Sequence, residues 1–298
     1  MSTELLTTSQ LRDKLETTWL KHIKLCQDNF LYFVANVWPD FIYRKTNDPE
    51  RHGHHQIIAD ELVKISNSKR GRLIINMPPR HTKSEFASFL FPAWFIGKFP
   101  KKKIMQVSHN AELAQRFGSK VRNLMDSPEY KQIFGDVKLR EDSKAKGRWE
   151  TSHGGEYFAA GVGGSITGRG ADLLIIDDPH TEQDSMSDSA MERAYEWYSS
   201  GPRQRLQPGG SILVVMTRWA QDDLTGRLLK NQTDPKGDKW QQISFPAILP
   251  SGEPVWPEYW ELEELEKVKA SISIRNWNAQ YMQEPTSEEG AILKREWW

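Results

Sequence analysis

Residues 76–85, NMPPRHTKSE, end in a lysine and a hydroxyl that could bind a phosphate group. In a phosphate-binding loop, G-x-x-x-x-G-K-[ST], backbone N–H groups and the lysine surround the phosphates while the hydroxyl binds Mg²⁺. Lys83 and Ser84 match the end of this pattern, but Met77 and Thr82 stand where it has glycine. The stretch predicts a nucleotide site with an unusual loop, and it leaves open a Pro-Pro turn with an exposed lysine.

Two adjacent carboxylates, Asp177 and Asp178, follow four apolar residues in the stretch LLIIDD. At the end of a buried strand such groups need solvent or a cation as partner, because an unpaired buried charge is costly. Open α/β sheets hold ligands at the carboxyl ends of their strands. We therefore expect Asp177 to bind Mg²⁺ through water and Asp178 to orient or deprotonate an attacking water. A surface Asp-Asp turn before Pro179 is the alternative, but the loop and the strand end together favour a nucleotide site.

Two further polar groups could complete the site. The strand pattern VVMTRW ends in Thr217, and a polar residue at that strand tip would lie beside the γ-phosphate and could sense hydrolysis. The glycine-rich stretch GGSITGRGADLL carries Arg169, and its glycines permit close backbone approach to a ligand or a neighbouring subunit. An arginine there could act as a finger on a transferring phosphate. A plain strand terminus and a solvated loop arginine are the alternatives.

Composition limits the class of protein. The chain has 298 residues, of which 38% are hydrophobic, enough for one large α/β domain with appendages or for two modest domains. Its 40 basic and 40 acidic residues cancel, so no global field attracts a polyanion, although a local basic face is not excluded. The single cysteine, Cys26, rules out internal disulfides and suits a reducing compartment. No apolar run reaches the length of a membrane span, and the scattered tryptophans indicate packing rather than base stacking.

Secondary structure is predicted to alternate along most of the chain. Short apolar runs predict strands at residues 72–77, 102–108, 154–161, 171–178, 211–217 and 240–248. Helical spacing predicts helices at residues 8–39, 55–68, 82–99, 110–127, 187–200, 221–232 and 261–270. This alternation is typical of an α/β fold, with a mainly parallel sheet covered by helices on both faces and a helical N-terminal extension.

Three motifs in their order and spacing, PPRHTKSE, GRGADLLIIDDPH and VMTRWAQDDLTGRLL, resemble the ATPase half of the large terminase subunit of tailed bacteriophages. The resemblance covers roughly residues 30–298. It implies a RecA-like ASCE P-loop NTPase fold and ATP-driven translocation of double-stranded DNA into a procapsid. The implied cofactors are ATP and Mg²⁺. The implied partners are double-stranded DNA, the portal protein, the small terminase subunit and further copies in a ring on the portal. The implied location is the host cytoplasm, without a membrane and outside the mature virion.

The resemblance also assigns roles to residues by their motifs. Those implied to contact ATP are Gln56, from the adenine-side motif HHQII, and Pro79, Arg80, His81, Thr82, Lys83 and Ser84. Those implied to hold the metal are Ser84 and Asp177. Those implied to act in catalysis are Lys83, Asp178 as the catalytic carboxylate, Thr217 in the coupling position and Arg169. Arg80 and Arg169 are both candidate arginine fingers.

Two departures from the family pattern modify these expectations. Thr82 replaces a glycine, and a β-branched residue resists the left-handed backbone that glycine tolerates. We therefore expect a loop that is open until nucleotide or a neighbouring subunit closes it, with weak affinity. Asp178 replaces the more usual glutamate, and its shorter reach predicts slow hydrolysis in an isolated subunit.

The expected division of the chain is a helical segment at 1–50, an ATPase core at 51–250 and a lid or linker at 251–298. The resemblance implies a nuclease domain after that linker. Because no later strand carries acidic residues, we expect no nuclease activity in this chain. Residues 283–298 resemble a linker to a partner domain. For gripping DNA phosphates, the stretch at 140–149 is favoured over Lys101–Lys103, which precede a strand and should lie opposite the nucleotide.

Two other functions remain open. A helicase-like DNA-dependent ATPase would need a second RecA-like domain, for which the chain has no room. A nucleotide-binding assembly or scaffold module with little hydrolysis is compatible with the departures at Thr82 and Asp178.

Overall fold

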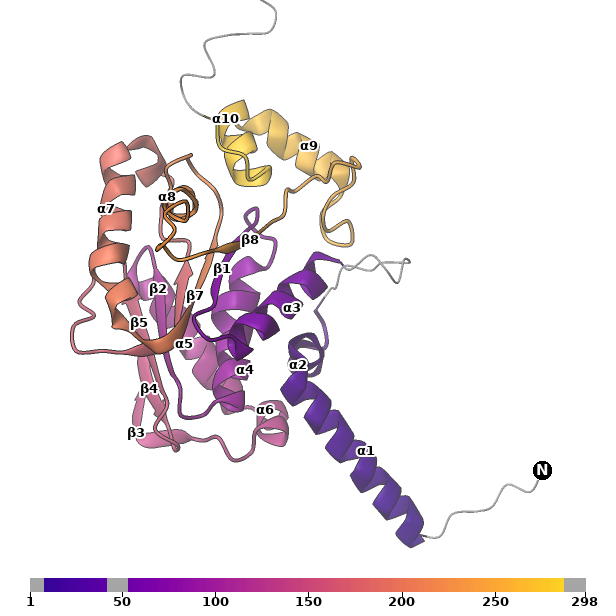
Figure 1. Ribbon diagram of the computed structural model, residues 1–298. Coiled ribbons are helices and arrows are strands. Elements are labelled where there is room, and N and C mark those ends of the chain that lie inside the picture. The colour runs from indigo at the N-terminus through magenta and orange to yellow at the C-terminus, as the bar shows by residue number, and fades with distance from the viewer. Residues whose placement is uncertain (1–7, 42–52, 287–298) are drawn as a thin grey trace, which may run out of the picture.

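The computed structural model describes residues 8–41 and 53–286. Its centre is one sheet, and the strands are β1 (Arg72–Asn76), β2 (Lys103–Ser108), β3 (Leu139–Ala145), β4 (Arg148–Thr151), β5 (Glu156–Gly161), β6 (Ala171–Asp177), β7 (Leu206–Met216) and β8 (Gln241–Ser244). Their order is β3-β4-β5-β2-β6-β7-β1-β8 (Figure 1). From β5 to β8 all neighbours are parallel, whereas β3 and β4 pair antiparallel. The predicted α/β class with a mainly parallel sheet is confirmed.

Helices connect and cover the strands. The α-helices are α1 (Thr8–Asp28), α2 (Phe30–Val37), α3 (His54–Asn67), α4 (Phe91–Lys98), α5 (Ala111–Met125), α6 (Pro128–Ile133), α7 (Asp188–Ser200), α8 (Leu224–Asn231), α9 (Leu262–Ser271) and α10 (Ile274–Asn276). The remaining turns are two π-helical segments, η1 (Glu85–Leu90) and η4 (Trp277–Tyr281), and two 3₁₀ segments, η2 (Asp184–Met186) and η3 (Pro202–Arg205). No helix in the described ranges combines the length and the apolar character needed to cross a membrane.

Both faces of the sheet are buried, and strand β6 shows why its sequence is apolar throughout. Leu173 and Ile175 belong to the core under helices α2 to α5, and the alternate residues Leu174 and Ile176 belong to the core under α7 and α8. Figure 1 shows these two helical layers on opposite sides of the sheet. Since side chains of a strand alternate between faces, a strand covered on both sides reads as a continuous hydrophobic run. Helices on both faces were predicted and are confirmed.

The N-terminal helical extension consists of two helices. Asn29 separates the two helices. Its side chain caps α2 by accepting a hydrogen bond from the Tyr32 N–H at 2.8 Å. Helix α2 buries Phe30 and Phe33 against the core, whereas α1 extends from the body (Figure 1). The part of the predicted 1–50 segment at residues 1–7 and 42–50 lies outside the described residues.

The helix predicted after the phosphate loop is present but contains a π-helical turn. This turn, η1, ends immediately before α4, in which Pro92 occupies the first turn. In a regular α-helix the Pro92 ring would clash with the carbonyl of Ser88 and leave that carbonyl without its donor. A wider turn before the proline relieves the clash, which is a common cause of such bulges.

Strands β3 and β4 were not predicted. They form the antiparallel edge of the sheet, where they pair with each other and β4 pairs with β5. Most of the side chains of β3 are polar, so the strand has no apolar alternation that would identify it. Its partner β4 is short and contributes Trp149 to the core. The residue stretch favoured for DNA binding forms this hairpin.

After β8 the chain runs through residues 245–260 to α9. The sequence predicted this helix at residues 261–270. Leu265 of α9 packs with Trp277 and Ala247 in a small separate cluster. The end of the predicted linker, residues 287–298, lies outside the described residues.

Candidate active site

The predicted phosphate loop and carboxylates meet at one edge of the sheet. Strands β1, β7 and β6 are adjacent and parallel, with Asn76 opposite Met216 and Asp177 opposite Val215, so all three end at the same level. The residues that follow therefore converge. Lys83 Nζ lies 2.9 Å from Asp178 Oδ2. The Ser84 hydroxyl donates a hydrogen bond of 2.8 Å to Asp177 Oδ1.

Asp177 is buried at the carboxyl end of β6, where its charge is poorly compensated. Its second oxygen, Oδ2, is enclosed by protein and makes no well-formed hydrogen bond to any described residue. Burial and the neighbouring Asp178 raise the pKa of Asp177, whereas Lys83 and the Ser88 and Ser84 hydroxyls act in the opposite direction. An orphaned carboxylate oxygen beside a serine hydroxyl fits a hard divalent cation, which prefers such oxygen ligands.

Asp178 is held from several sides in a strained backbone conformation. Its φ is 41°, in the left-handed region that costs a non-glycine residue about 1–3 kcal/mol. The Thr217 N–H donates 2.9 Å to Asp178 Oδ1, and the Thr217 hydroxyl donates 3.0 Å to the Met77 carbonyl. The His109 N–H donates 3.2 Å to the Asp178 carbonyl. Thr217 thus joins the ends of β1, β6 and β7.

The loop adopts the left-handed conformation that its sequence was expected to resist. Arg80 has φ 62° and Thr82 has φ 66°. The Thr82 hydroxyl donates 2.6 Å to the His81 carbonyl and lies 3.2 Å from His55 Nε2. Since threonine has one hydroxyl proton, the His55 ring must be the donor in the second contact. The expectation that Thr82 keeps the loop out of this conformation is wrong, because these two hydrogen bonds offset its strain.

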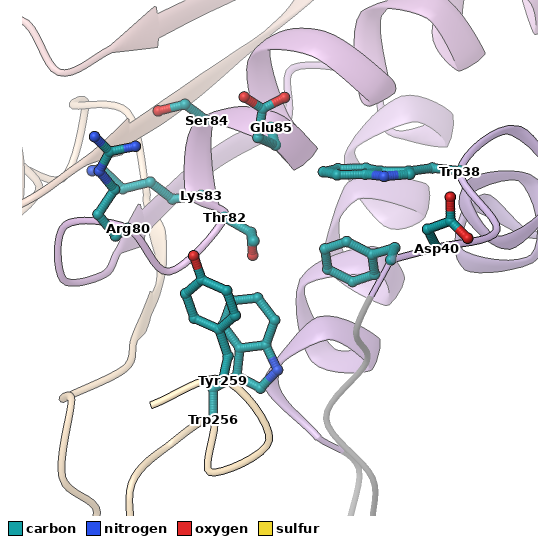
Figure 2. A pocket seen from close by; sticks show the side chains of 10 residues that line it. Trp38, Asp40, Arg80, Thr82, Lys83, Ser84, Glu85, Trp256 and Tyr259 are labelled. Atoms are coloured by element: carbon teal, nitrogen blue, oxygen red, sulfur yellow. The ribbon is translucent and has the colours of Figure 1, made fainter. Parts of the chain in front are cut away.

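A cavity of about 480 Å³ lies next to the loop (Figure 2). Its lining consists of loop residues and of side chains from both ends of the chain: Trp38, Asp40, Phe41, Arg80, Thr82, Lys83, Ser84, Glu85, Trp256 and Tyr259. Figure 2 shows Trp38 facing the loop across the cavity, with Tyr259 and Trp256 on the adjoining side. The loop provides cationic and hydroxyl groups, and most of the remaining wall is aromatic.

The aromatic wall was missed by the sequence analysis. Trp38 follows α2, and Trp256 and Tyr259 come from the segment before α9, where their rings stack at 4.4 Å. Nearby, Trp260 stacks on His81 of the loop at 5.7 Å. The stretch VWPEYW was the available signal, but it was interpreted as part of a linker, and the tryptophans were assigned to packing. Their proximity to the loop depends on the tertiary fold.

Comparisons with known proteins fit this geometry. No family model matches the sequence. The large terminase subunit of Enterobacteria phage T3 is 23% identical over 193 residues, which cover 64% of this chain and 32% of that protein. This chain therefore spans about a third of that relative's length. The ATPase domain of the Thermus phage P74-26 large terminase, solved as a point mutant, matches with a TM-score of 0.52 and 14% identity over 82% of this chain and 100% of that one. The HK97 bacteriophage large terminase matches with a TM-score of 0.51 and 12% identity over 86% of this chain and 54% of that one.

The chain has the fold of a large terminase ATPase domain. The RecA-like architecture implied by the motifs is thereby confirmed, as is the resemblance to large terminase subunits. The roles of individual residues in this terminase-like chain remain predictions, and the structure shows where each residue lies.

The two candidate arginine fingers lie at opposite edges of the terminase-like sheet. Arg80 lines the cavity. Arg169 precedes β6, so it lies on the order of 20 Å from Asp177 at the far end of that strand. It pairs with Glu156 and its guanidinium lies 4.5 Å from the centre of the Phe158 ring. Of these two arginines, Arg80 is the one that lies beside the phosphate site of its own chain.

The remaining predicted ATP contacts occupy different places. Gln56 is absent from the cavity lining, and its amide donates 2.8 Å to Asp60 one turn further along α3. His81 Nδ1 donates 2.8 Å to the Pro79 carbonyl, so these two residues shape the loop from its buried side. Burial, opposed by the bond to Pro79 and reinforced by Lys83, lowers the pKa of His81 to about 4. The His81 ring is therefore neutral at pH 7.

A second network extends from Thr217 to the C-terminal segment. The next residue, Arg218, is buried and its Nε lies 2.9 Å from Asp223 Oδ2, at the cap of α8. The Arg218 N–H donates 3.1 Å to Oε1 of Gln283. Gln283 has φ 60° and is buried after η4. Sequence reasoning did not identify Gln283, because nothing in its local pattern distinguishes it.

Proposed function

We propose that this chain is the ATPase domain of a viral DNA-packaging motor, which hydrolyses ATP in a Mg²⁺-dependent reaction to translocate double-stranded DNA into a procapsid. The observation that supports it most is the convergence of Lys83, Ser84, Asp177 and Asp178, with Lys83 and Ser84 lining a cavity. The terminase-like fold is the second support.

The ion pair between Lys83 and Asp178 must separate when ATP binds. Lys83 would then contact the terminal phosphate oxygens, which replace the carboxylate as its partner. Asp178 is thereby released to accept a hydrogen bond from the attacking water, and the Thr217 N–H keeps its carboxylate oriented. Opening this pair couples nucleotide binding to exposure of the catalytic carboxylate.

Ser84 and Asp177 would hold the divalent cation. When bound, Mg²⁺ supplies positive charge against the phosphate oxygens. In the described residues no group of three or more His, Cys, Asp or Glu side chains could hold a metal by itself. The metal therefore depends on phosphate oxygens and water for most of its ligands, which is usual for Mg²⁺ at nucleotide sites.

The aromatic wall would receive the nucleobase. Trp38 and Tyr259 are the partly exposed rings of this wall, and a purine stacked on either remains in contact with the cavity that Lys83 borders. Gln56, the residue nominated by motif, would have to release Asp60 to contribute.

Partners follow from the same proposal. They are double-stranded DNA, the portal protein, the small terminase subunit and further copies of the chain in a ring on the portal, in the host cytoplasm. In such a ring Arg169 would serve the site of a neighbour, because it lies at the edge opposite its own loop. We also propose the division into a helical segment at 1–50, a core at 51–250 and a lid at 251–298.

One observation favours the second candidate function, a nucleotide-binding assembly module with little hydrolysis. Lys83 and Asp178 neutralise each other, so while they are paired neither group is available to phosphate or to an attacking water. A helicase-like ATPase has no comparable support, because the described residues form one sheet of the RecA type rather than two.

Steady-state ATP hydrolysis with and without duplex DNA tests the proposal. We expect Mg²⁺-dependent turnover that DNA increases, and Lys83→Ala should reduce it to background. Lys267→Ala, at an exposed lysine on α9, is the matched control and should retain full activity. Full activity in Lys83→Ala would refute the site assignment. ATP binding without turnover, in the presence of DNA, would favour the assembly module.

A further inference from the structure

A second groove runs along the outer side of helix α5, beginning next to the active site. It encloses about 610 Å³. Its lining comes from the residues before and on α5 and from the β3–β4 turn: His109, Asn110, Glu112, Leu113, Gln115, Arg116, Ser119, Arg122 and Lys146. From residue 109 to residue 122 the groove follows the helix for roughly 20 Å at 1.5 Å per residue.

Two glycines bring the β3–β4 turn against α5. A Cβ at Gly118 would lie 2.6 Å from the Lys146 carbonyl, and a Cβ at Gly147 would lie 2.6 Å from the Gln115 side chain. The Trp149 indole N–H, donating 3.1 Å to the Gly118 carbonyl, fixes the hairpin in this position. Lys146 is therefore held beside α5 by backbone contacts rather than by its own charge.

The groove contains two cations that make no ion pair within the described residues. Arg116 and Lys146 are exposed and make no ion pair or hydrogen bond with any described residue. On the same hairpin, Arg140 pairs with Glu150 at 2.6 Å and Arg148 lies 3.3 Å from Glu156. Within the stretch at 140–149, Lys146 is thus a cation that remains available for an external anion.

Helix α5 is attached to both halves of the candidate active site. At its N-terminal end, the N–H of His109 donates to the Asp178 carbonyl at 3.2 Å. On its inner side, Lys120 Nζ donates to both oxygens of Glu85, at 2.6 and 2.9 Å. Glu85 directly follows Ser84 and lines the nucleotide cavity. A ligand that displaces α5 therefore displaces backbone next to the catalytic carboxylate and the phosphate loop.

We propose that this α5 groove binds the phosphate backbone of duplex DNA, with Arg116 and Lys146 as the contacting cations. The inference rests on the proposed function and specifies the surface that its polyanionic partner uses. Roughly 20 Å of duplex axis carries about six phosphates on each strand, so several can face the groove at once. Binding there conveys the presence of DNA to Asp178 through His109 and to Glu85 through Lys120.

A competing basic surface lies at the opposite edge of the sheet. That cavity, of about 590 Å³, is lined in part by Lys69, Arg70 and Lys102. Lys102 is already bound to Asp172 at 2.7 Å. Being at the amino ends of the strands, this surface has no such hydrogen bond to Asp178 or Glu85. It therefore offers a control with the same charge but without the connection to the active site.

Binding of the full 298-residue chain to a short duplex, measured against salt concentration, tests the proposal. The double variant Arg116→Ala/Lys146→Ala should bind roughly 10- to 100-fold more weakly at 0.1 M salt, and the slope of log affinity against log salt should fall by about 1.8 for two lost phosphate contacts. Lys69→Ala/Arg70→Ala, which removes one lysine and one arginine from the competing surface, is the control and should keep the affinity and slope of the unaltered chain.

ATP turnover provides the second measurement. Without DNA the groove variant should hydrolyse ATP at the unaltered rate, because neither side chain borders the nucleotide cavity. Stimulation by DNA should be lost in the groove variant and kept in the control. DNA binding and stimulation that survive the groove substitutions would overturn this inference and leave the proposed function standing. Absence of DNA binding by the unaltered chain would overturn both.

Discussion

Backbone strain is concentrated at the residues that would handle phosphate. Arg80, Thr82 and Asp178 all have positive φ without being glycine. Each such residue costs about 1–3 kcal/mol, so local hydrogen bonds must hold it in place. For Thr82 those bonds run from its hydroxyl to the His81 carbonyl and from His55 to the hydroxyl. The hydroxyl, rather than the small size of glycine, makes this loop conformation possible.

Replacing Thr82 by valine tests this explanation. Thr82→Val keeps the β-branched shape but removes both hydrogen bonds and leaves the buried His55 N–H without its acceptor, a loss of about 1–3 kcal/mol. We expect the midpoint of thermal unfolding to fall by roughly 2–4 °C for each kcal/mol of folding free energy lost. The affinity for ATP should also fall. Thr82→Ser, which keeps the hydroxyl, should retain both. Equal behaviour of the two variants would refute the role of the hydroxyl.

Single residues were predictable where chemistry constrains their type. Lys83, Ser84 and Asp177 stand at motif positions, and the structure brings them together. The conformation of Thr82 was predicted incorrectly, because propensity alone does not include a hydrogen bond to His55 from another helix. The position of Gln56 was not predictable from its motif, because its partner on α3 competes for the same amide.

At the scale of elements, β7 connects the active site to the C-terminal segment. Thr217, which follows this strand, holds Asp178, and the neighbouring Arg218 N–H is held by Gln283. Two adjacent peptides therefore join the Asp178 carboxylate to the segment after η4. Removing the Gln283 acceptor loosens one end of this connection without touching the nucleotide cavity.

Gln283→Ala is expected to lower kcat for ATP by about fivefold, which corresponds to about 1 kcal/mol for one lost hydrogen bond, with little change in KM. Gln280→Ala removes an equivalent amide from the same segment and should leave kcat unchanged. Steady-state kinetics at saturating DNA would measure both. A change confined to KM would contradict a role in orienting Asp178.

Elements were predictable where both faces are buried or one stripe is apolar. Strand β6 and helix α5 were found within a few residues of their predicted bounds. The β3–β4 hairpin was missed because an edge pair with polar side chains has no periodic signal. The π-helical turn before Pro92 was also missed, since its sequence is helical by pattern and only the proline ring changes the hydrogen bonding.

At the scale of the whole molecule, several histidines are buried in neutral form. Burial, with His54 and His81 adding to it, lowers the pKa of His55 to about 2, and burial likewise lowers the pKa values of His81 and His180. The unfolded chain takes up these protons below about pH 6.5, whereas the folded chain does not. Their contribution to stability is present above pH 6.5 and is lost as pH falls toward the folded pKa values. The raised pKa of Asp177 acts in the opposite direction, because the folded chain takes up a proton there at higher pH than the unfolded chain. It is a single group, whereas three histidines lose stability.

The free energy of unfolding should therefore decrease as pH is lowered from about 6.5 to about 5, with His55 and His81 each contributing about 1.4 kcal/mol per pH unit and Asp177 offsetting part of the loss. His81→Phe keeps a ring against Trp260 and should reduce this slope by the share of one histidine. His153→Phe, at an exposed histidine, is the control and should not change it. Denaturant unfolding at several pH values measures the slope, and an unchanged slope in His81→Phe would contradict the assignment.

The whole molecule was predictable in its class but not in its surfaces. Short apolar runs that alternate with helical patterns indicated a parallel sheet with two helical layers, because strands buried on both faces are apolar throughout. The aromatic wall and the α5 groove each combine residues that are far apart in the chain. Trp38 and Tyr259 approach each other through the fold, and a net charge of zero concealed Arg116 and Lys146.

The contact between Lys83 and Asp178 has a consequence for the timing of a working cycle. The carboxylate is tethered next to the ammonium group, so it competes with a bound phosphate for Lys83 at a high effective concentration. When the hydrolysis product begins to dissociate, Asp178 can pair with Lys83 again and oppose rebinding of the product. The proposed ATPase would thus bind nucleotide more weakly but release the product faster, which suits a motor that works where ATP is abundant.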